Sequence, residues 1–212
     1  MKPRTNWPRR GIYLLTPDEP DTARLLARVG PLLAAGVALL QYRNKTADDM
    51  RRREQAEALL RLCREYAVPL IINDDWPLAA AIGADGAHLG EHDGELASAR
   101  AALGDAAILG ASCYNDLARA EHAATQGADY LAFGAFFRSD TKPNARPASL
   151  SLLADSAHLG LPRVAIGGIT PDNAAPLLAA GADLLAVITS VFNAPDPVRA
   201  VHAFNSLFDR SP

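Results

Sequence analysis

The stretch GADGAHLG, from Gly83 to Gly90, decides the fold because related stretches recur along the chain. GADYLAFG begins at Gly127, GADLLAVI begins at Gly181, and a looser copy, GVALLQYR, begins at Gly36. In each copy a helical run ends at the glycine and an apolar strand follows. Glycine suits such a helix end because it adopts the left-handed conformation without a Cβ clash. The aspartate that follows in three copies suits a tight turn.

Outward from these copies, apolar runs alternate with helical runs over the whole chain. The helical runs include TARLLARVGPLLAAG, DLARAEHAATQG and PDNAAPLLAAG. The expected strands are Gly11–Thr16, Val37–Arg43, Pro69–Asp74, Gly86–Leu89, Ala107–Cys113, Tyr130–Phe137, Arg163–Ile169 and Leu184–Val191. Several are apolar at consecutive positions, which is typical of strands buried on both faces.

Regular alternation of strand and helix predicts parallel strands joined by right-handed crossovers. The four glycine copies precede the second, fourth, sixth and eighth strands, so each repeat contains two strand–helix units. Eight such units predict an α/β fold of the (β/α)8 TIM-barrel type. We expect a single domain over residues 1–212, in which residues 1–10 form a short N-terminal extension.

Composition is that of an ordinary soluble domain, with 49% hydrophobic and 21% charged residues. The net charge of −3 gives no indication of a nucleic-acid or polybasic membrane surface. The basic start MKPRTNWPRR is not followed by an apolar segment, so neither a signal peptide nor a membrane span is expected. Cys63 and Cys113 form no disulfide or metal pattern, which favours a cytoplasmic protein with reduced thiols.

The chemistry of such a barrel is expected at the C-terminal ends of its strands. In the second strand, Val37, Leu39, Gln41 and Arg43 share one face by the period of two, so the last two should rise into the barrel mouth. Any one polar residue here could be a solvated loop residue, but together they indicate a site. The polar residues that follow strands two to six include Gln41, Arg43, Lys45, Asn73, Asp74, Asp93, Ser112, Ser139, Thr141 and Lys142.

Carboxylates that follow the third and fourth strands can approach one cation, since neighbouring strands lie about 4.8 Å apart. Mg²⁺ usually takes one or two carboxylates together with substrate phosphates, and Arg43, Lys45 and Lys142 would add positive charge. A second anion site is indicated by AIGGIT after the seventh strand, with Pro171 opening a helix. Taken alone, the two glycines are explained equally well by a tight turn.

The motifs QYRNK, PLIINDD, GADGAHLG followed by Asp93, TKPNA and VAIGGITPDN resemble the thiamine phosphate synthase family. The resemblance runs from GIYLLTPD to APDP, nearly the whole chain. It implies a transferase that joins hydroxymethylpyrimidine pyrophosphate to thiazole phosphate, giving thiamine phosphate and pyrophosphate. The implied route is a dissociative, Mg²⁺-assisted substitution: pyrophosphate leaves, and the thiazole nitrogen attacks the pyrimidine-methyl cation.

The resemblance also implies roles for individual residues. Gln41, Arg43, Lys45, Asn73, Ser112 and Lys142 would contact the pyrimidine pyrophosphate, with Arg43, Lys45, Ser112 and Lys142 as catalytic residues. Asp74 and Asp93 would bind Mg²⁺. Ser139, Thr141, Gly167, Gly168, Ile188 and Thr189 would contact the thiazole phosphate. Arg138 and Asp140 are unusual for the family, and no histidine, His88 included, receives a catalytic role.

Three alternatives remain: a thiazole tautomerase, a non-catalytic regulator, and a phosphosugar isomerase or epimerase on the same barrel. The clustered cations and carboxylates argue against each of them. The expected partners are the two small-molecule substrates, with no nucleic acid and no membrane, and a homo-oligomer is possible. The polar stretch RSDTKPNARP, from Arg138 to Pro147, is long for its position and is expected to be a mobile lid that carries Lys142.

Overall fold

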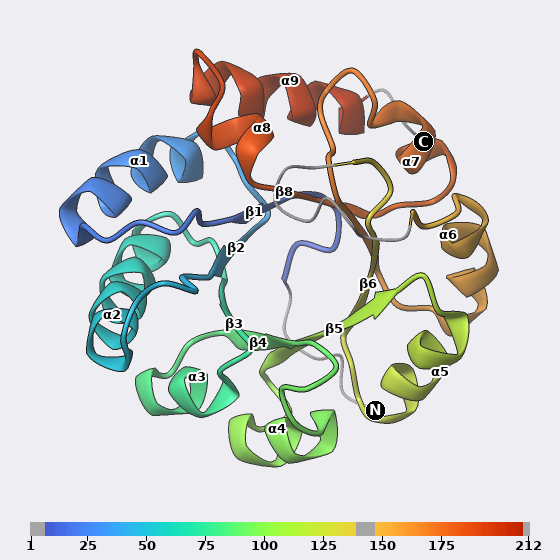
Figure 1. Cartoon of the computed structure of the whole chain (residues 1–212), viewed down its shortest axis with the longest axis horizontal. Helices are drawn as coiled ribbons and strands as arrows, with labels where there is room; N and C mark the ends of the chain where they lie inside the picture. The colour runs from blue at the N-terminus through green and yellow to red at the C-terminus, as the bar shows by residue number, and fades with distance from the viewer. Residues whose placement is uncertain (1–6, 139–146, 210–212) are drawn as a thin grey trace.

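Eight parallel strands close into a barrel in the order of the sequence, and β1 pairs with β8 to complete the ring (Figure 1). This computed structural model describes residues 7–138 and 147–209. The strands are β1 Gly11–Leu15, β2 Leu39–Tyr42, β3 Leu70–Asn73, β4 Gly86–Leu89, β5 Ile108–Tyr114, β6 Tyr130–Gly134, β7 Arg163–Ile166 and β8 Leu184–Val187. The predicted (β/α)8 barrel and its eight strands are therefore confirmed.

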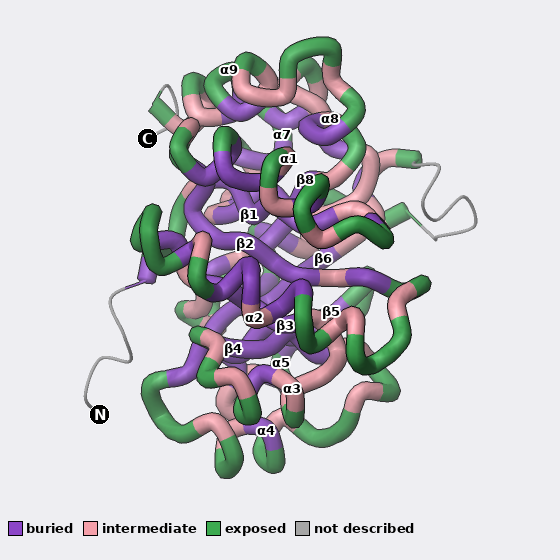
Figure 2. The backbone as a smooth tube through the Cα atoms, turned by 90° about the vertical axis from the view of Figure 1, so that its left-hand side faces the viewer, coloured by how far each residue is buried: buried purple, intermediate pink, exposed green. Residues whose placement is uncertain are grey.

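Helices form a ring outside the strands (Figure 1), and the exposed segments lie mainly on their outer surfaces (Figure 2). They are α1 Thr22–Ala34, α2 Asp49–Glu65, α3 Trp76–Ile82, α4 Leu96–Leu103, α5 Leu117–Thr125, α6 Ser151–Asp155, η1 Ser156–Leu159, α7 Ala175–Ala179, α8 Thr189–Phe192 and α9 Pro197–Asp209. Within the described ranges, no helix combines the length and apolarity that crossing a bilayer requires.

Both faces of the strands are buried, which explains their consecutive apolar residues. On β1, Ile12 and Leu14 pack outward in the layer between strands and helices. Tyr13 and Leu15 point into the barrel interior, where they join a second cluster. Alternate residues of a strand thus contribute to two concentric cores, one inside the barrel and one between the strands and the helices.

Trp7 belongs to the interior cluster, although it lies in the segment expected to be a mere extension. Its side chain is 6% exposed, and its ring packs edge-on against Tyr130 with centroids 6.0 Å apart. Figure 1 shows this first described segment, in dark blue, lying inside the ring of strands. It therefore packs against the interior from the N-terminal side, before β1 begins.

The glycines of the repeat have the predicted left-handed backbone. The φ angles of Gly36, Gly83, Gly127 and Gly181 are 93°, 67°, 94° and 101°. Each of these residues follows or caps a helix, so a side chain there would be strained. The expectation drawn from the repeat is confirmed at all four positions.

The aspartates of the repeat do more than form a turn. The carboxylates of Asp85, Asp129 and Asp183 each accept a 2.8 Å hydrogen bond from a backbone N–H near the start of the preceding strand. These N–H groups belong to Leu70 on β3, Leu109 on β5 and Arg163 on β7. The repeat therefore ties each of three strand pairs together at the N-terminal end of the barrel.

Several boundaries differ from the prediction. The sixth and seventh strands end at Gly134 and Ile166 rather than at Phe137 and Ile169. The eighth strand ends at Val187 rather than Val191, because the N–H groups of Val191 and Phe192 turn back to the carbonyl of Ile188 and begin α8. β2 begins only at Leu39, and Val37 packs in the outer core rather than on the inner face with Leu39. Apolar β-branched runs fit either a strand or a short buried helix, so the sequence pattern could not resolve these ends.

Candidate active site

Two carboxylates meet at the mouth of the barrel. Asp74 follows β3, and its N–H donates to the carbonyl of His88 on β4 at 2.8 Å. Its φ of 63° is rare outside glycine and is typical of constrained functional positions. Burial, and then the hydrogen bond and the charge of Asp93, raise the pKa of Asp74 to about 6. The predicted pair from neighbouring strands is therefore in contact.

The loop between β4 and α4 holds Asp93 in place. Its Oδ2 atom accepts a 2.7 Å hydrogen bond from the N–H of Gly90. A Cβ at Gly90 would lie 2.7 Å from that same oxygen, so a side chain there would displace the carboxylate. Glycine at this position lets the loop close tightly around Asp93.

Asp75, the other carboxylate of the motif INDD, has a structural task. It is the N-cap of α3, and its Oδ1 atom accepts the N–H of Leu78 at 2.9 Å. Such a cap satisfies one of the unpaired N–H groups of the first helical turn. Of the two adjacent aspartates, Asp74 is the one in contact with the loop after β4.

The cationic side chains after β2 lie beside this pair. Lys45 is exposed and close enough to Asp74 for its charge to lower the pKa of that carboxyl. The backbone of Arg43 is held on both sides by Thr16, whose Oγ1 accepts its N–H at 2.9 Å and donates to its carbonyl at 2.8 Å. The predicted residues Lys45, Asp74 and Asp93 are thus brought together, and Asn73, which ends β3, also hydrogen-bonds Asp74.

Asp18 contacts both Arg43 and Lys45, and it was not among the predicted site residues. Its Oδ1 atom lies 3.3 Å from Nη1 of Arg43 and accepts the N–H of Lys45 at 2.8 Å. Asp18 lies in the loop after β1. The rule that selected polar residues directly after the other strands would also have selected it. Asp18 therefore orients the loop that carries both cations.

Gln41 and Ser112 end a chain of hydrogen bonds inside the barrel. Gln41 is buried, and its Nε2 donates to the hydroxyl of Tyr13 at 2.7 Å. The Oγ atom of Ser112 lies 2.9 Å from Nε2 of His88. His88 received no role from the sequence, because its partners come from other strands and no local spacing identifies them.

At the second predicted anion site, after β7 and β8, the local structure differs from the prediction. Pro171 opens a turn rather than a helix, because α7 begins only at Ala175. Gly167 and Gly168 have φ of 107° and 61°, and a Cβ at Gly168 would lie 2.3 Å from the carbonyl oxygen of Arg138. The fold alone therefore requires both glycines, whatever they bind.

Ile188 and Thr189 stand where α8 begins, directly after β8. In the closed barrel, β7 and β8 lie opposite β3 and β4. The two predicted substrate subsites are therefore on opposite sides of one mouth. Ser139, Thr141, Lys142 and most of the predicted lid lie outside the described residues, so those predictions are untested.

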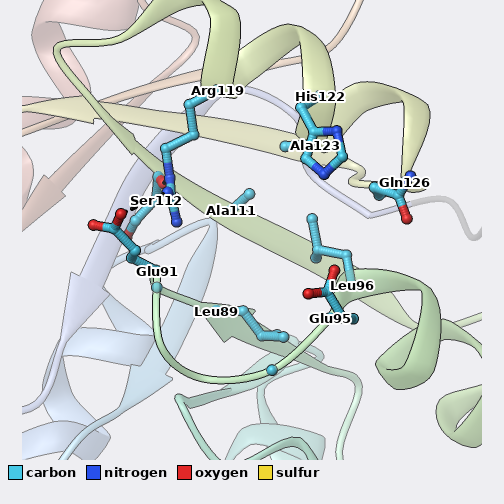
Figure 3. Close-up of a pocket in the computed structure, with 12 residues that line it drawn as sticks. Leu89, Glu91, Glu95, Leu96, Ala111, Ser112, Arg119, His122, Ala123 and Gln126 are labelled. Atoms are coloured by element: carbon cyan, nitrogen blue, oxygen red, sulfur yellow. Dashed lines mark hydrogen bonds and ion pairs between the residues drawn. The ribbon is translucent and has the colours of Figure 1, made fainter.

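A cavity of about 200 Å³ opens beside Ser112, between the loop that leads to α4 and helix α5 (Figure 3). Glu91 and Arg119 face each other at its edge, and their ion pair is 3.4 Å long. The Nε atom of Arg119 also donates to the carbonyl of Ser112 at 2.8 Å. Asp74 and Asp93 do not line this cavity, but Gly90, whose N–H donates to Asp93, does.

Together, the closed barrel and the carboxylates set beside cationic side chains define an α/β-barrel protein with a charged mouth at the C-terminal ends of its strands. Residues 12–191 match the family model described as thiamine monophosphate synthase, and the chain belongs to that family.

The relatives agree with this assignment. A thiamine-phosphate synthase of Xylella fastidiosa (strain 9a5c) is 55% identical over 98% of this chain and 88% of its own length. One from Xanthomonas campestris pv. campestris (strain 8004) is 57% identical, over 94% of this chain and 96% of its own length. The solved thiamine phosphate pyrophosphorylase of Pyrococcus furiosus is 32% identical, with a TM-score of 0.84 over 96% of this chain and 97% of its own.

Proposed function

We propose that this protein is a thiamine phosphate synthase, a transferase that joins hydroxymethylpyrimidine pyrophosphate to thiazole phosphate. The observation that carries the proposal is the contact between Asp74 and Asp93, with Lys45 beside them. Two adjacent carboxylates destabilise each other unless a cation or a proton lies between them. Burial first, and then the hydrogen bond and charge of Asp93, raise the pKa of Asp74. Family membership supports the same conclusion.

The donor set fits magnesium. Among the described residues, no group of three His, Cys, Asp or Glu side chains is arranged for a metal, so the carboxylate pair is the candidate ligand set in that part of the chain. Mg²⁺ is commonly held by one or two carboxylates, with water and phosphate oxygens as the other ligands. Asp74 and Asp93 would bind it, and when bound it would draw charge from the departing pyrophosphate.

The residues of this chain would bind and orient the two substrates. Arg43 and Lys45 would hold the pyrophosphate through charge, together with Lys142, while Gln41, Asn73 and Ser112 would contact the pyrimidine part. The bond between the pyrimidine methylene carbon and pyrophosphate breaks, and its electron pair leaves with pyrophosphate. The lone pair of the thiazole nitrogen then forms the new carbon–nitrogen bond. Positioning both partners in one site lowers the entropic barrier to this substitution.

The thiazole phosphate would bind on the opposite side of the mouth, at Gly167, Gly168, Ile188 and Thr189, with Ser139 and Thr141. Barrels of this type frequently bind phosphate at the loops after β7 and β8 and at the start of a short extra helix. The helix α8, which begins at Thr189, is in that position. This arrangement would leave the nitrogen of the thiazole facing the pyrimidine across the mouth.

The direct test supplies the purified protein with both substrates and Mg²⁺ and measures thiamine phosphate and pyrophosphate. We expect equal amounts of the two products, and none when either substrate is omitted. A folded protein that releases no thiamine phosphate would refute the proposal. Conversion of thiazole phosphate alone would instead identify the tautomerase alternative.

A further inference from the structure

Five side chains from five strands form a continuous chain of hydrogen bonds through the barrel interior. It runs from Gln41 through Tyr13, Tyr130 and His88 to Ser112, and we name it the interior chain. The successive distances are 2.7 Å, 2.7 Å, 3.0 Å and 2.9 Å. Its two ends are proposed contacts of the pyrimidine, whereas its three middle residues have no part in the function proposed above.

The fold makes room for the interior chain. Tyr13 and Tyr130 are 1% and 0% exposed, and their rings meet edge to face with centroids 5.6 Å apart. The imidazole of His88 stacks on Tyr130 at the same centroid distance. Gly110 on β5 is required here, since a Cβ would lie 1.9 Å from the ring of Tyr130. The strand beside Tyr130 therefore lacks a side chain where this ring crosses the interior.

Counting protons gives the interior chain a direction. The Nε2 atom of Gln41 can only donate, so the hydroxyl of Tyr13 accepts from it and passes its own single proton to Tyr130. Burial raises the pKa of both phenols, so each keeps its proton. Tyr130 then donates to Nδ1 of His88, which must be the acceptor nitrogen.

A neutral imidazole with an accepting Nδ1 carries its proton on Nε2. That proton is donated to Oγ of Ser112, which leaves the proton of the serine hydroxyl for another partner. At the other end, the Oε1 atom of Gln41 takes no part in the chain. Each end thus keeps one hydrogen-bonding group outside the interior chain: a donor at Ser112 and an acceptor at Gln41.

We propose that Tyr13, Tyr130 and His88 are positioning residues, which hold the Ser112 hydroxyl as a hydrogen-bond donor and the Gln41 carboxamide with its oxygen as an acceptor toward the pyrimidine. The inference rests on the proposed function for the identity of that ligand. The ring nitrogens of a pyrimidine accept hydrogen bonds, which matches a donating serine. Reversing any one link of the chain would leave a buried donor or acceptor without its partner.

Tyr130→Phe tests the proposal, because it removes the central hydroxyl and keeps the packed ring. We expect the KM for the pyrimidine pyrophosphate to rise about tenfold, the equivalent of one lost hydrogen bond, while the KM for the thiazole phosphate stays within about twofold. Tyr13→Phe breaks the next link and should likewise raise the KM for the pyrimidine pyrophosphate but not the KM for the thiazole phosphate. It also serves if Tyr130→Phe does not fold.

Tyr42→Phe is the matched control. Its hydroxyl is also in a buried side chain, 2% exposed, and it donates to Oε1 of Gln55 at 2.9 Å in the outer layer. This variant should be destabilised like the other two and should keep both KM values. If the two interior variants raise both KM values equally, or behave as Tyr42→Phe does, the three residues serve the core alone and the proposal is overturned.

A second readout needs no turnover and so separates this inference from the proposed function. The ¹⁵N shifts of the His88 imidazole in the full-length, ligand-free protein report its tautomer, with the signal assigned by its loss in His88→Gln. We expect a single neutral Nε2–H tautomer in the wild type and a mixture in Tyr130→Phe. A predominant Nδ1–H tautomer in the wild type would overturn the deduced direction, whether or not the protein makes thiamine phosphate.

Discussion

Asp74 and Asp75 are neighbours in sequence with different tasks, and the difference follows from the backbone. The left-handed conformation of Asp74 turns the chain after β3, and its carboxyl meets Asp93. Asp75 then returns to a negative φ of −104°, with ψ of 73°, and caps α3. Two consecutive residues thus serve as a proposed metal ligand and as a helix cap.

We predict that Asp74→Asn and Asp93→Asn each lower turnover about 10²- to 10³-fold, as expected for the loss of an electrostatic stabiliser of the leaving group. Steady-state rates at several Mg²⁺ concentrations measure this effect, and circular dichroism checks the fold. The loss should be greatest at low Mg²⁺. Near-normal turnover of both variants at low Mg²⁺ would refute the metal assignment.

The raised pKa of Asp74 also predicts a pH-dependent stability of the metal-free protein. Because the folded state binds this proton more tightly than the unfolded chain, the cost of ionisation is absent below the ordinary pKa of 3.8 and fully present above about 6. Asp74→Asn should therefore raise the free energy of unfolding at about pH 7.5 by roughly 1–2 kcal/mol, after allowance for solvent screening, and by less at about pH 4.5.

Urea unfolding in the presence of a chelator measures that stability difference. Asp75→Asn is the control, since asparagine caps helices about as well as aspartate and should change little at either pH. A stability gain for Asp74→Asn that is equal at both pH values would show that ionisation of this carboxyl is not the cause.

At the scale of elements, the aspartates of the repeat join neighbouring strands. Asp129 does so while it is also paired with Arg100, whose Nη2 lies 2.5 Å from Oδ2, and both side chains are largely buried. The carboxylate of Asp85, by comparison, accepts the single N–H of Leu70 at 2.8 Å. We therefore expect the aspartate of the repeat to contribute more to the free energy of unfolding at Asp129 than at Asp85.

We predict that Asp129→Ala costs about 3–5 kcal/mol, because it leaves a buried guanidinium without its carboxylate. Asp85→Ala should cost about 1–3 kcal/mol, the loss of a partner for one backbone N–H. Urea denaturation of the two variants gives both values, and their KM values should stay close to those of the wild type. Equal losses would mean that the Arg100 ion pair adds nothing.

The short helix α8 offers a test of the second subsite. Thr189→Val keeps the shape of the side chain and removes its hydroxyl at the start of the helix. The KM for the thiazole phosphate should rise severalfold, on the order of one hydrogen bond, and the KM for the pyrimidine substrate should not change. Initial rates with each substrate varied in turn decide the matter. An equal change in both would place Thr189 outside the thiazole subsite.

At the scale of the whole molecule, closure of the barrel creates an interior that the N-terminal segment helps to fill. Trp7 packs there against Tyr130, so the predicted extension contributes to the core. We expect Trp7→Ala to cost about 3–5 kcal/mol in the free energy of unfolding. Arg9→Ala is the control, because its exposed guanidinium only lies over the Trp7 ring, 5.9 Å from the centroid. Similar small losses in both variants would contradict a core role for Trp7.

Closure also places the two proposed substrate subsites on opposite sides of the mouth, because β3 and β4 face β7 and β8 across the ring. A reaction that joins two substrates benefits from such an arrangement, in which each substrate has its own binding surface and the reacting atoms meet between them. The same closure brings Tyr13 of β1 within 2.7 Å of Tyr130 of β6. The interior chain therefore exists only in the complete barrel.

By itself, the sequence determined the eight strands, the glycines at the helix ends, and the polar residues that follow β2 to β5. These features depend on local periodicity and turn chemistry, so they can be recognised in a single stretch of chain. Short-range patterns were insufficient at the start of β2 and at the ends of β6, β7 and β8, where apolar residues suit either a strand or a buried turn.

Only the tertiary structure decided which polar residues act together. The pairing of Asp18 with Arg43, the ties from Asp85, Asp129 and Asp183, and the link from His88 to Ser112 all join residues from different elements. Hydrogen bonds and ion pairs require contact within a few ångströms, and contact between distant residues is created by the packing of elements rather than by their spacing along the chain. For that reason a role for His88 and Tyr130 can be recognised only in the closed barrel and not from the sequence alone.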